Sequence, residues 1–130
     1  AGDVHAPGYY VHIAPDEVFL GVGCWRPDRG ALARIRERIL AQPAMWRSAR
    51  DDANFQRQYA LAGDSLKRPP RGYPPDHPFV DDLRRTDFLG LRALDHAAIT
   101  EPDFVEEVAA SFAAAQPFMR FLCRALDLQF

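Results

Sequence analysis

The stretch YYVHIAPDEVFLGVGCW, residues 9–25, decides the fold. Side chains of residues 9–14 alternate between two faces with a period of two, which is typical of a β-strand. Pro15 and Asp16 follow, and this pair favours a turn because proline suits the second position of a turn. Residues 17–25 then alternate again. The two segments therefore predict a β-hairpin.

The two faces of this hairpin carry different side chains. On the second strand one face is apolar, with Val18, Leu20, Val22 and Cys24, and the other carries Phe19, Gly21, Gly23 and Trp25. Because alternate glycines leave the second face bare, we expect another group to pack closely against it. A covering helix is the commoner arrangement. The alternative is a pocket with Tyr10, His12 and Trp25 on its floor.

Helical spacing follows the hairpin. Residues 26–42 repeat apolar side chains at helical intervals, and Asp28 is a suitable N-cap. Pro43 opens a second helical stretch that a turn around residues 51–52 breaks in two. Its predicted buried side chains are Met45, Trp46, Ala49, Phe55 and Tyr59.

The last third of the chain predicts one strand and one long helix. Residues 88–94 are apolar enough for a mostly buried strand. The clearest helical periodicity runs from residue 101 to about residue 127, and Thr100 with Asp103 resembles a capping box. Pro117 is expected to kink this helix or to split it in two.

This order of strands and helices predicts an α+β fold. We expect residues 1–130 to form a single domain, with an antiparallel sheet built on the N-terminal hairpin and residues 88–94, and with helices packed mainly on one face. No internal repeat or flexible Gly/Ser linker marks a second domain.

Composition bounds the function. The net charge of −2 and the pI near 6.1 argue against nucleic-acid binding by bulk positive charge. No apolar run approaches the ~18 residues that a membrane span needs. Cys24 and Cys123 lie far apart in the sequence, so we interpret them as reduced thiols of a cytoplasmic protein, with a disulfide as the minor alternative.

Residues 63–78, GDSLKRPPRGYPPDHP, contain too many prolines and glycines for a helix or a central strand. Lys67, the only lysine, lies near Arg68 and Arg71, and two prolines between these arginines stiffen the backbone. The segment predicts either an anion-binding loop or a brace. In the brace, which is slightly favoured, the arginines pair with Asp64, Asp76, Asp81 or Asp82. Asp76 would also cap a short helix that starts nearby.

Catalytic and metal motifs are weak. His5, His12, His77 and His96 are scattered, and neither histidines nor cysteines show the spacing of metal ligands. No serine lies in a nucleophile motif. We therefore expect no metal and no cofactor.

Three motifs carry a resemblance to a known family: GYYVHIAP at residues 8–15, the strand end with Gly23, Trp25 and Pro27, and LKRPPRGYPPDHP at residues 66–78. With them the chain resembles domain-of-unknown-function family 2461 of bacteria and fungi. The resemblance implies that Lys67, Arg68, Tyr73, Asp76 and His77 belong to one recurrent unit. It also implies that the chain is the C-terminal part of a longer family domain and lacks its N-terminal region.

Three functions follow as hypotheses. The first is a binding module for an anionic or phosphate-bearing small ligand, with the site formed by Lys67, Arg68, Arg71, Tyr10, His12, Trp25 and Tyr73. The second is an enzyme that uses His12 or His77 as acid/base, with Asp76 orienting it. The third is a structural module that docks the family's N-terminal region or a second subunit, for example as a homodimer paired through a sheet edge.

Overall fold

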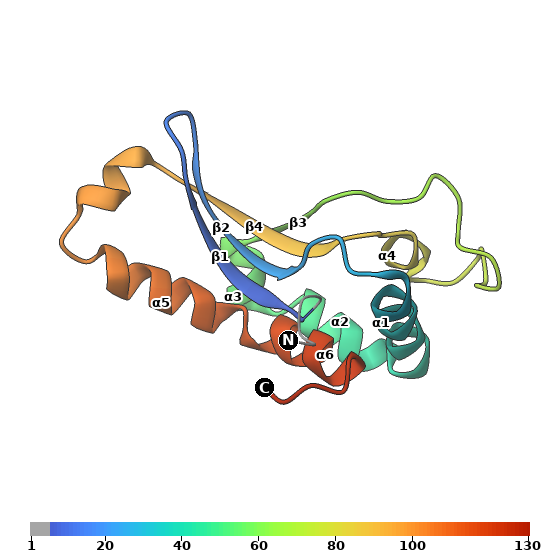
Figure 1. Cartoon of the computed structure of the whole chain (residues 1–130). Helices are drawn as coiled ribbons and strands as arrows, with labels where there is room; N and C mark the ends of the chain where they lie inside the picture. The colour runs from blue at the N-terminus through green and yellow to red at the C-terminus, as the bar shows by residue number, and fades with distance from the viewer. Residues whose placement is uncertain (1–5) are drawn as a thin grey trace.

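A computed structural model describes residues 6–130 of the chain; residues 1–5, which include His5, lie outside the described part. Four strands form one antiparallel sheet in the order β1-β2-β4-β3. The strands are β1 (Gly8–Ile13), β2 (Val18–Cys24), β3 (Ala60–Ala62) and β4 (Phe88–Leu94). The helices are α1 (Arg29–Ala41), α2 (Pro43–Arg50), α3 (Ala53–Gln58), α4 (Val80–Leu83), α5 (Phe104–Ala114) and α6 (Gln116–Ala125), with the 3-10 helix η1 (His96–Thr100). The predicted α+β fold is confirmed, and the larger helices lie along one face of the sheet (Figure 1).

The predicted hairpin is confirmed. β1 and β2 pair from Gly8 opposite Gly23 to Ile13 opposite Val18. Ala14 and Glu17 close the turn between them with backbone hydrogen bonds of 2.9 and 3.3 Å. A nitrogen of His96 lies 2.8 Å from the carbonyl oxygen of Ala14. Because His96 belongs to η1, which follows β4, this contact joins the hairpin turn to the segment after β4. His96 is therefore a structural residue.

The core lies between the apolar face of β2 and the helices. Trp46 of α2 is fully buried, and its ring centroid lies 5.1 Å from that of Phe121 in α6. Phe55 of α3 stacks on Phe118 of α6 at 4.7 Å. Such aromatic pairs contribute about 0.5–1.5 kcal/mol beyond the burial of their surface. The residues with no exposed surface include Leu20, Val22, Ile35, Ile39, Leu83 and Leu122.

Asp28 caps α1 as predicted, since its Oδ1 accepts a hydrogen bond of 2.8 Å from the backbone N–H of Ala31. The break between α2 and α3 also lies where the sequence indicated, at residues 51–52. Four of the five side chains predicted to be buried there are buried, and the fifth, Met45, is 37% exposed. Met45 lines a hollow on the helical side of the molecule instead of packing in the core.

Two predicted helix starts are wrong. α4 begins at Val80, and the N–H of Phe79 donates to Nδ1 of His77 at 2.9 Å, so Asp76 caps nothing. α5 begins at Phe104, after η1 and a turn. The expected capping box is absent there, because the hydroxyl of Thr100 donates to the carbonyl oxygen of Ala97 instead. Near Pro117 the predicted helix splits, as expected, into α5 and α6.

The sequence did not predict the short strand β3. Its three residues pair with Leu89, Gly90 and Leu91 of β4 and form one edge of the sheet. Three residues are too few to show a period of two, so only the pairing partner defines this strand.

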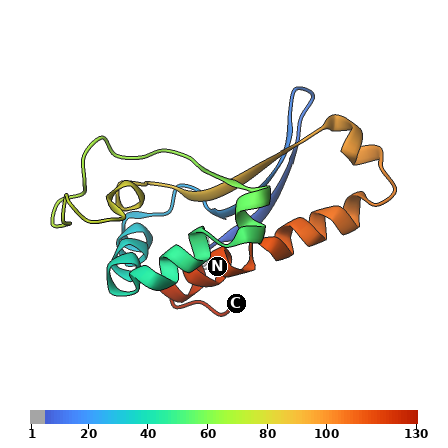
Figure 2. The same cartoon turned by 180° about the vertical axis from the view of Figure 1, so that it is seen from behind.

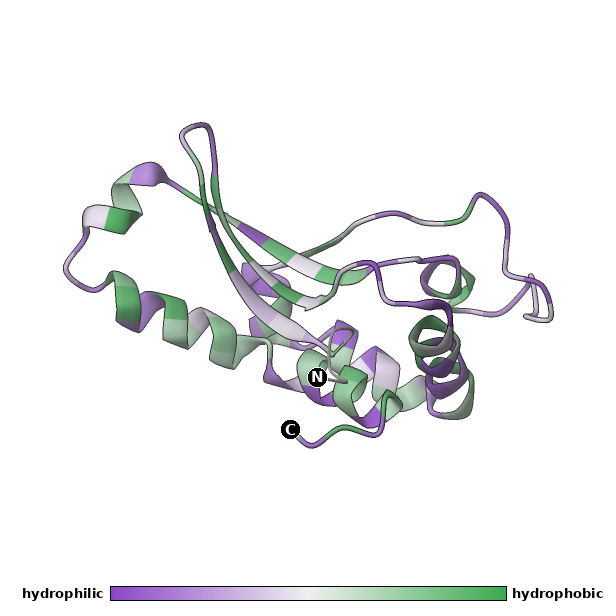
Figure 3. Cartoon of the chain, in the orientation of Figure 1, coloured by the Kyte–Doolittle hydropathy of each residue, from purple (hydrophilic) through white to green (hydrophobic). Residues whose placement is uncertain are grey.

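The second face of the sheet is open. The expected covering helix is missing from residues 6–130, because all the larger helices pack against the other face (Figure 2). Apolar residues nevertheless continue along β2 and β4, which carry much of the hydrophobic colour in Figure 3. The alternative from the sequence, a pocket on this face, therefore becomes the arrangement to consider.

Candidate functional site

The open face of the sheet holds a hollow of about 590 Å³, which we name the sheet-face hollow. Its volume lies within the range of roughly 300–1,000 Å³ that is usual for ligand pockets. Tyr10 of β1 lies opposite Gly21 of β2, and Gly21 lies opposite Leu91 of β4, so the floor crosses three strands. The lining residues are Tyr10, Val11, His12, Phe19, Gly21, Trp25, Gly63, Leu89 and Leu91.

Gly21 places no side chain on the floor of this hollow. A Cβ atom at Gly21 would meet Leu91 Cδ2 at 3.4 Å and Tyr10 Cδ2 at 3.5 Å, which are ordinary contacts. A longer side chain at this position would therefore stand up into the hollow. Gly23 has a different role, because its φ is +118° and a Cβ there would lie 2.1 Å from the carbonyl oxygen of Phe88. Gly23 lets β2 and β4 approach each other.

His12 supplies a polar atom to the apolar hollow. Its ring stacks on Phe19 with centroids 4.4 Å apart. Nε2 lies 3.4 Å from Oε1 of Glu17 but makes no hydrogen bond with it and has almost no solvent contact. This nitrogen is thus shielded from solvent, and the Glu17 carboxylate lies beside it. Nearby, burial and the proximity of Cys24 raise the pKa of Tyr10, so its phenol stays neutral and can donate a hydrogen bond.

Trp25 and Arg26 form one rim of the hollow. Trp25 is 60% exposed, an unusual position for the largest apolar side chain. The guanidinium carbon of Arg26 lies 4.9 Å from the centroid of this ring, a cation–π contact. Arg26 makes no ion pair within residues 6–130, so its charge is open to an anion. Sequence analysis did not single out Arg26.

Buried Asp87 holds two segments of the rim together. Its Oδ1 accepts a hydrogen bond of 2.6 Å from the N–H of Arg26, and its Oδ2 accepts one of 2.9 Å from the N–H of Asp64. Arg26 has φ of 51° and Gly63 has φ of +100°, both in the left-handed region. Asp87 therefore stabilises a strained backbone next to Trp25 and at the start of the 63–78 loop. No motif in the sequence indicated this role.

The structure does not bring the predicted cations into the sheet-face hollow. Lys67, Arg68 and Arg71 are exposed and line none of the hollows described in this section or below. They also form no ion pair with any described carboxylate, so the predicted brace of paired arginines is wrong. Only Gly63, at the start of their loop, lies in the lining.

The loop is braced by other contacts. Its first part pairs with residues 84–86, where the N–H of Leu66 donates to the carbonyl oxygen of Arg84 at 2.7 Å. Its second part docks on α1, because the hydroxyl of Tyr73 donates to Oε1 of Glu37 at 3.0 Å. Burial, followed by this bond, raises the pKa of Tyr73. The loop is thus ordered, and it packs on α1 and the segment before β4.

Asp76 and His77 do not form a charge pair in the structure. Asp76 is exposed, whereas Nδ1 of His77 already accepts the N–H of Phe79. The proton of the neutral ring consequently belongs on Nε2. His77 lies just before α4, whereas His12 lies on β1, so the two histidines are not part of one site.

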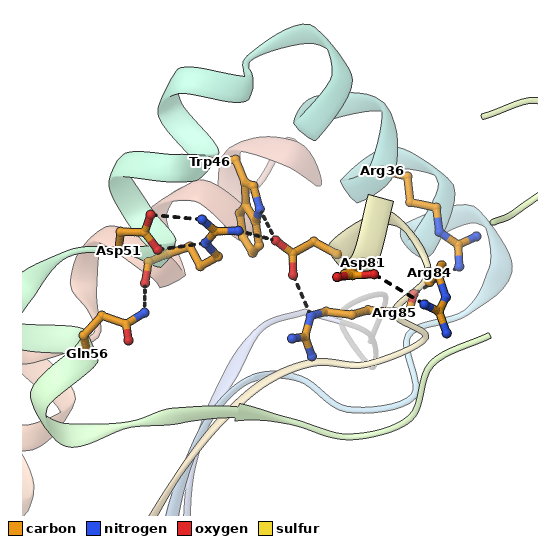
Figure 4. Close-up of polar contacts among 9 residues, drawn as sticks. Arg36, Trp46, Asp51, Gln56, Asp81, Arg84 and Arg85 are labelled. Carbon is orange, nitrogen blue, oxygen red and sulfur yellow. Dashed lines mark hydrogen bonds and ion pairs between the residues drawn. The ribbon is translucent and has the colours of Figure 1, made fainter. Parts of the chain in front are cut away.

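The most polar part of the interior surrounds Asp82 (Figure 4). Its Oδ2 accepts hydrogen bonds of 2.8 Å from Trp46 Nε1 and 3.0 Å from Arg50, and its Oδ1 accepts one of 3.0 Å from Arg85. Arg36 adds a bond of 3.0 Å to the carbonyl oxygen of Arg85, and burial lowers its pKa. The Asp82 carboxylate is fully used by its donors, and the cluster joins α1, α2 and α4, although Nε of Arg36 has no hydrogen-bond partner among the described residues.

The two thiols are buried and free. Burial, with a smaller contribution from Cys123, raises the pKa of Cys24 to about 12, so neither its position nor its charge state suits a nucleophile. In the part of the chain that the structure describes, no group of three His, Cys, Asp or Glu side chains is placed to hold a metal ion. Every helix in residues 6–130 is too short or too polar to cross a bilayer.

Comparison with known proteins agrees with the motifs. The family model described as "Conserved hypothetical protein (DUF2461)" matches residues 1–121. Neither the curated proteins nor the solved structures yielded a match. The match spans nearly the whole chain and includes the hairpin, the 63–78 loop and β4. The protein therefore belongs to the DUF2461 family.

Proposed function

We propose that this domain is a binding module for a small ligand that combines a flat apolar body with one anionic group. The observation that carries the proposal is the hollow of about 590 Å³ on an uncovered sheet face, with a largely exposed tryptophan at its rim. Apolar surface left open on a sheet is typical of a binding site. Phe19, Leu89 and Leu91 would contact the body of the ligand.

The polar groups of the hollow suggest the ligand's charge. The neutral phenol of Tyr10 can donate a hydrogen bond to an acceptor, and the ring of His12 also lines the hollow. Arg26, held over Trp25, adds a positive charge at the rim. The loop that carries Lys67, Arg68 and Arg71 starts at Gly63 in the lining, but these three cations line no part of the hollow, so the proposal assigns the anion to Arg26 instead.

Fluorescence titration with anilinonaphthalene sulfonate tests the proposal, since this probe has an aromatic body and one sulfonate. Trp25→Ala should weaken its affinity roughly tenfold or more, as is usual for an aromatic anchor. Val105→Ala is the matched control, because Val105 is 74% exposed on α5, outside the lining. Equal effects of the two substitutions would show that the probe binds exposed apolar surface in general, and the proposal would then be wrong.

The anionic part of the proposal has its own test. Decanoate should displace the probe more strongly than decylamine, a cation of equal length. Arg26→Gln should remove this preference while leaving displacement by decylamine unchanged. If decylamine competes as well as decanoate in the wild type, the ligand is apolar without a required anion.

A docking surface for a second polypeptide is the other candidate, and the edge strand β1 favours it. β1 pairs with β2 on one side, and among residues 6–130 no strand pairs with its other side. Tyr9, Val11 and Ile13 of this strand are 42%, 45% and 55% exposed. An open apolar edge of this kind is a template for strand addition.

Light scattering tests this candidate. A dimer that forms through β1 should dissociate in Ile13→Lys, because a charge at the edge opposes strand pairing. A wild-type protein that stays monomeric at millimolar concentration would eliminate pairing of two copies of this chain through β1. The binding proposal would remain, since Ile13 lies outside the sheet-face hollow.

A further inference from the structure

A different hollow lies on the helical side of the molecule, where α1, α2 and α6 meet (Figure 1). It measures about 160 Å³, and we name it the arginine hollow because three arginines line it. An adjoining hollow of about 360 Å³ shares Arg38 and Arg124 with it and adds Arg34 and Glu37. The lining residues of the arginine hollow are Arg38, Met45, Ser48, Ala49, Pro117, Arg120, Phe121 and Arg124.

The spacing of the four arginines concentrates positive charge. Arg34 and Arg38 lie four residues apart on α1, and Arg120 and Arg124 lie four apart on α6, so each pair shares one helix face. Like charges at this spacing repel each other and destabilise a helix unless an anion lies between them. Glu37 is the one carboxylate in either lining, and it already accepts a hydrogen bond from Tyr73.

None of these four arginines forms an ion pair within residues 6–130. Elsewhere in the same range Arg50, Arg84, Arg85 and Arg92 all pair with carboxylates. The chain has eighteen acidic and sixteen basic residues, so acids are not scarce. Arg26, Arg68 and Arg71 also lack an ion pair in the part of the chain that the structure describes, so this surface is distinguished by four unpaired arginines that lie together on two helices.

One donor in the hollow is both buried and unsatisfied. Nε of Arg38 has almost no solvent contact and no hydrogen-bond partner. A buried N–H without a partner is unfavourable, and native structures rarely leave one without a ligand or water to accept it. Arg38 lines both hollows, so an acceptor bound there would lie beside its guanidinium group.

We propose that the arginine hollow binds the phosphate group of a small phosphomonoester. Planar guanidinium groups match phosphate oxygens with paired hydrogen bonds, and Arg38, Arg120 and Arg124 present three of them together with the hydroxyl of Ser48. The organic part of the ligand extends into the adjoining hollow, whose lining includes the methyl groups of Ala33, Ala41 and Ala125. This site is separate from the sheet-face hollow and shares no residue with it.

Isothermal titration with inorganic phosphate and phenyl phosphate, in a chloride buffer of matched low ionic strength, tests the site. Both ligands should bind with saturation, and phenyl phosphate should bind more tightly because its ring occupies the adjoining hollow. Arg38→Gln and Arg124→Gln should each weaken binding roughly tenfold or more, since each removes a charged hydrogen-bond donor. Arg29→Gln is the matched control on α1: it removes the same charge outside both hollows and should change affinity less than about twofold.

Several outcomes would overturn the proposal. The proposal is wrong if the wild-type protein shows no saturable binding of phosphate. It is also wrong if Arg29→Gln lowers the affinity for phosphate as much as Arg38→Gln does, because binding would then depend only on the overall charge. Duplex DNA that competes fully with phenyl phosphate would assign the surface to nucleic acid instead. Should Arg38→Gln lower the melting temperature, exposed Arg120→Gln replaces it in the comparison. Trp25→Ala should leave phosphate binding unchanged. The proposal for the sheet-face hollow and the proposal for the arginine hollow can therefore be disproved independently of each other.

Discussion

Two buried carboxylates, Asp82 and Asp87, join segments that lie apart in the sequence. Asp87 accepts backbone N–H groups from Arg26 and Asp64, and so fixes the rim of the sheet-face hollow. Asp82 accepts hydrogen bonds from three side chains and joins α2 to α4 and to Arg85, which follows α4. Both carboxylates lie in the short segment before β4, which the sequence presents as an ordinary charged stretch. Their roles come from partners that are distant in the chain.

Asp82→Ala should destabilise the fold by about 3 kcal/mol or more, because it leaves Trp46 Nε1 and two arginines without their acceptor. Chemical denaturation measures the loss. Asp81→Ala is the control, since the side chain of Asp81 is 89% exposed and its ion pair with Arg84 lies at the surface. The control should change stability by less than about 0.5 kcal/mol. Similar losses for the two variants would contradict the assigned role of Asp82.

Cys24 should make stability fall at alkaline pH. Burial raises the pKa of its thiol from 9.0 to about 12, so folding favours the neutral form. The resulting stabilisation is complete below pH 9 and is lost as the pH rises from 9 to about 12, by up to about 1.4 kcal/mol per pH unit.

Urea denaturation at a series of pH values measures this loss. Cys24→Ala should show a shallower fall over the same interval, although its stability at pH 7 is also lower because of the cavity. Tyr9, Tyr10, Tyr59 and Tyr73 also have raised pKa values and contribute in the same direction above pH 10, but they are common to both proteins. Parallel curves for the two proteins would disprove the prediction.

At the scale of the elements, local pattern predicted the hairpin, α1, the break between α2 and α3, β4 and the split between α5 and α6. Each of these depends on neighbouring residues, such as Asp28 as a cap or Pro117 as a break. The start of α4 and the strand β3 did not follow from local pattern. No side chain of residues 6–130 caps α4, since His77 accepts the N–H of Phe79, which precedes the helix, and β3 exists only through its pairing with β4.

Gly23 and Gly72 both have positive φ, but only Gly23 lies close to another strand. Substitutions at the two positions therefore distinguish the cost of backbone strain from the cost of a steric clash. At Gly23 an added Cβ would strike the carbonyl oxygen of Phe88, whereas at Gly72 it would meet no atom within 4 Å. Gly72→Ala should therefore cost only the left-handed backbone strain, about 1 kcal/mol. Gly23→Ala should cost several times more, because β2 and β4 must separate. Thermal unfolding of the two variants gives the comparison, and equal costs would disprove the role assigned to Gly23.

For the whole molecule, one layer of helices covers one face of a sheet and leaves the other open (Figure 2). β2 is the most protected strand, because β1 and β4 flank it and its helix-facing side chains are fully buried. Among residues 6–130 no strand pairs with the outer edge of β1, and four of the six residues of β1 are exposed. The molecule thus has an unequal distribution of local stability.

Amide hydrogen exchange should follow this distribution. The amides of β2 and β4 should exchange slowest, close to the rate set by global unfolding, since both strands are paired on two sides. β1 and residues 66–78 should exchange faster through local opening. Mass spectrometry of peptic fragments resolves the two classes. If β1 exchanged as slowly as β2, another chain would have to cover its free edge.

The sequence by itself determined the fold class, the hairpin, most helix boundaries and the family, because these follow from local spacing, caps and contiguous motifs. It also indicated that Tyr10 and His12 share one face of the first strand, because a period of two requires it, and that Trp25 could join them from the second strand. Only the tertiary structure decided that no helix covers this face within residues 6–130. It likewise decided that Lys67, Arg68 and Arg71 lie away from the sheet-face hollow, and that arginines of α1 and α6 gather in another one. Those features depend on contacts between residues far apart in the chain, which the spacing of neighbours does not encode.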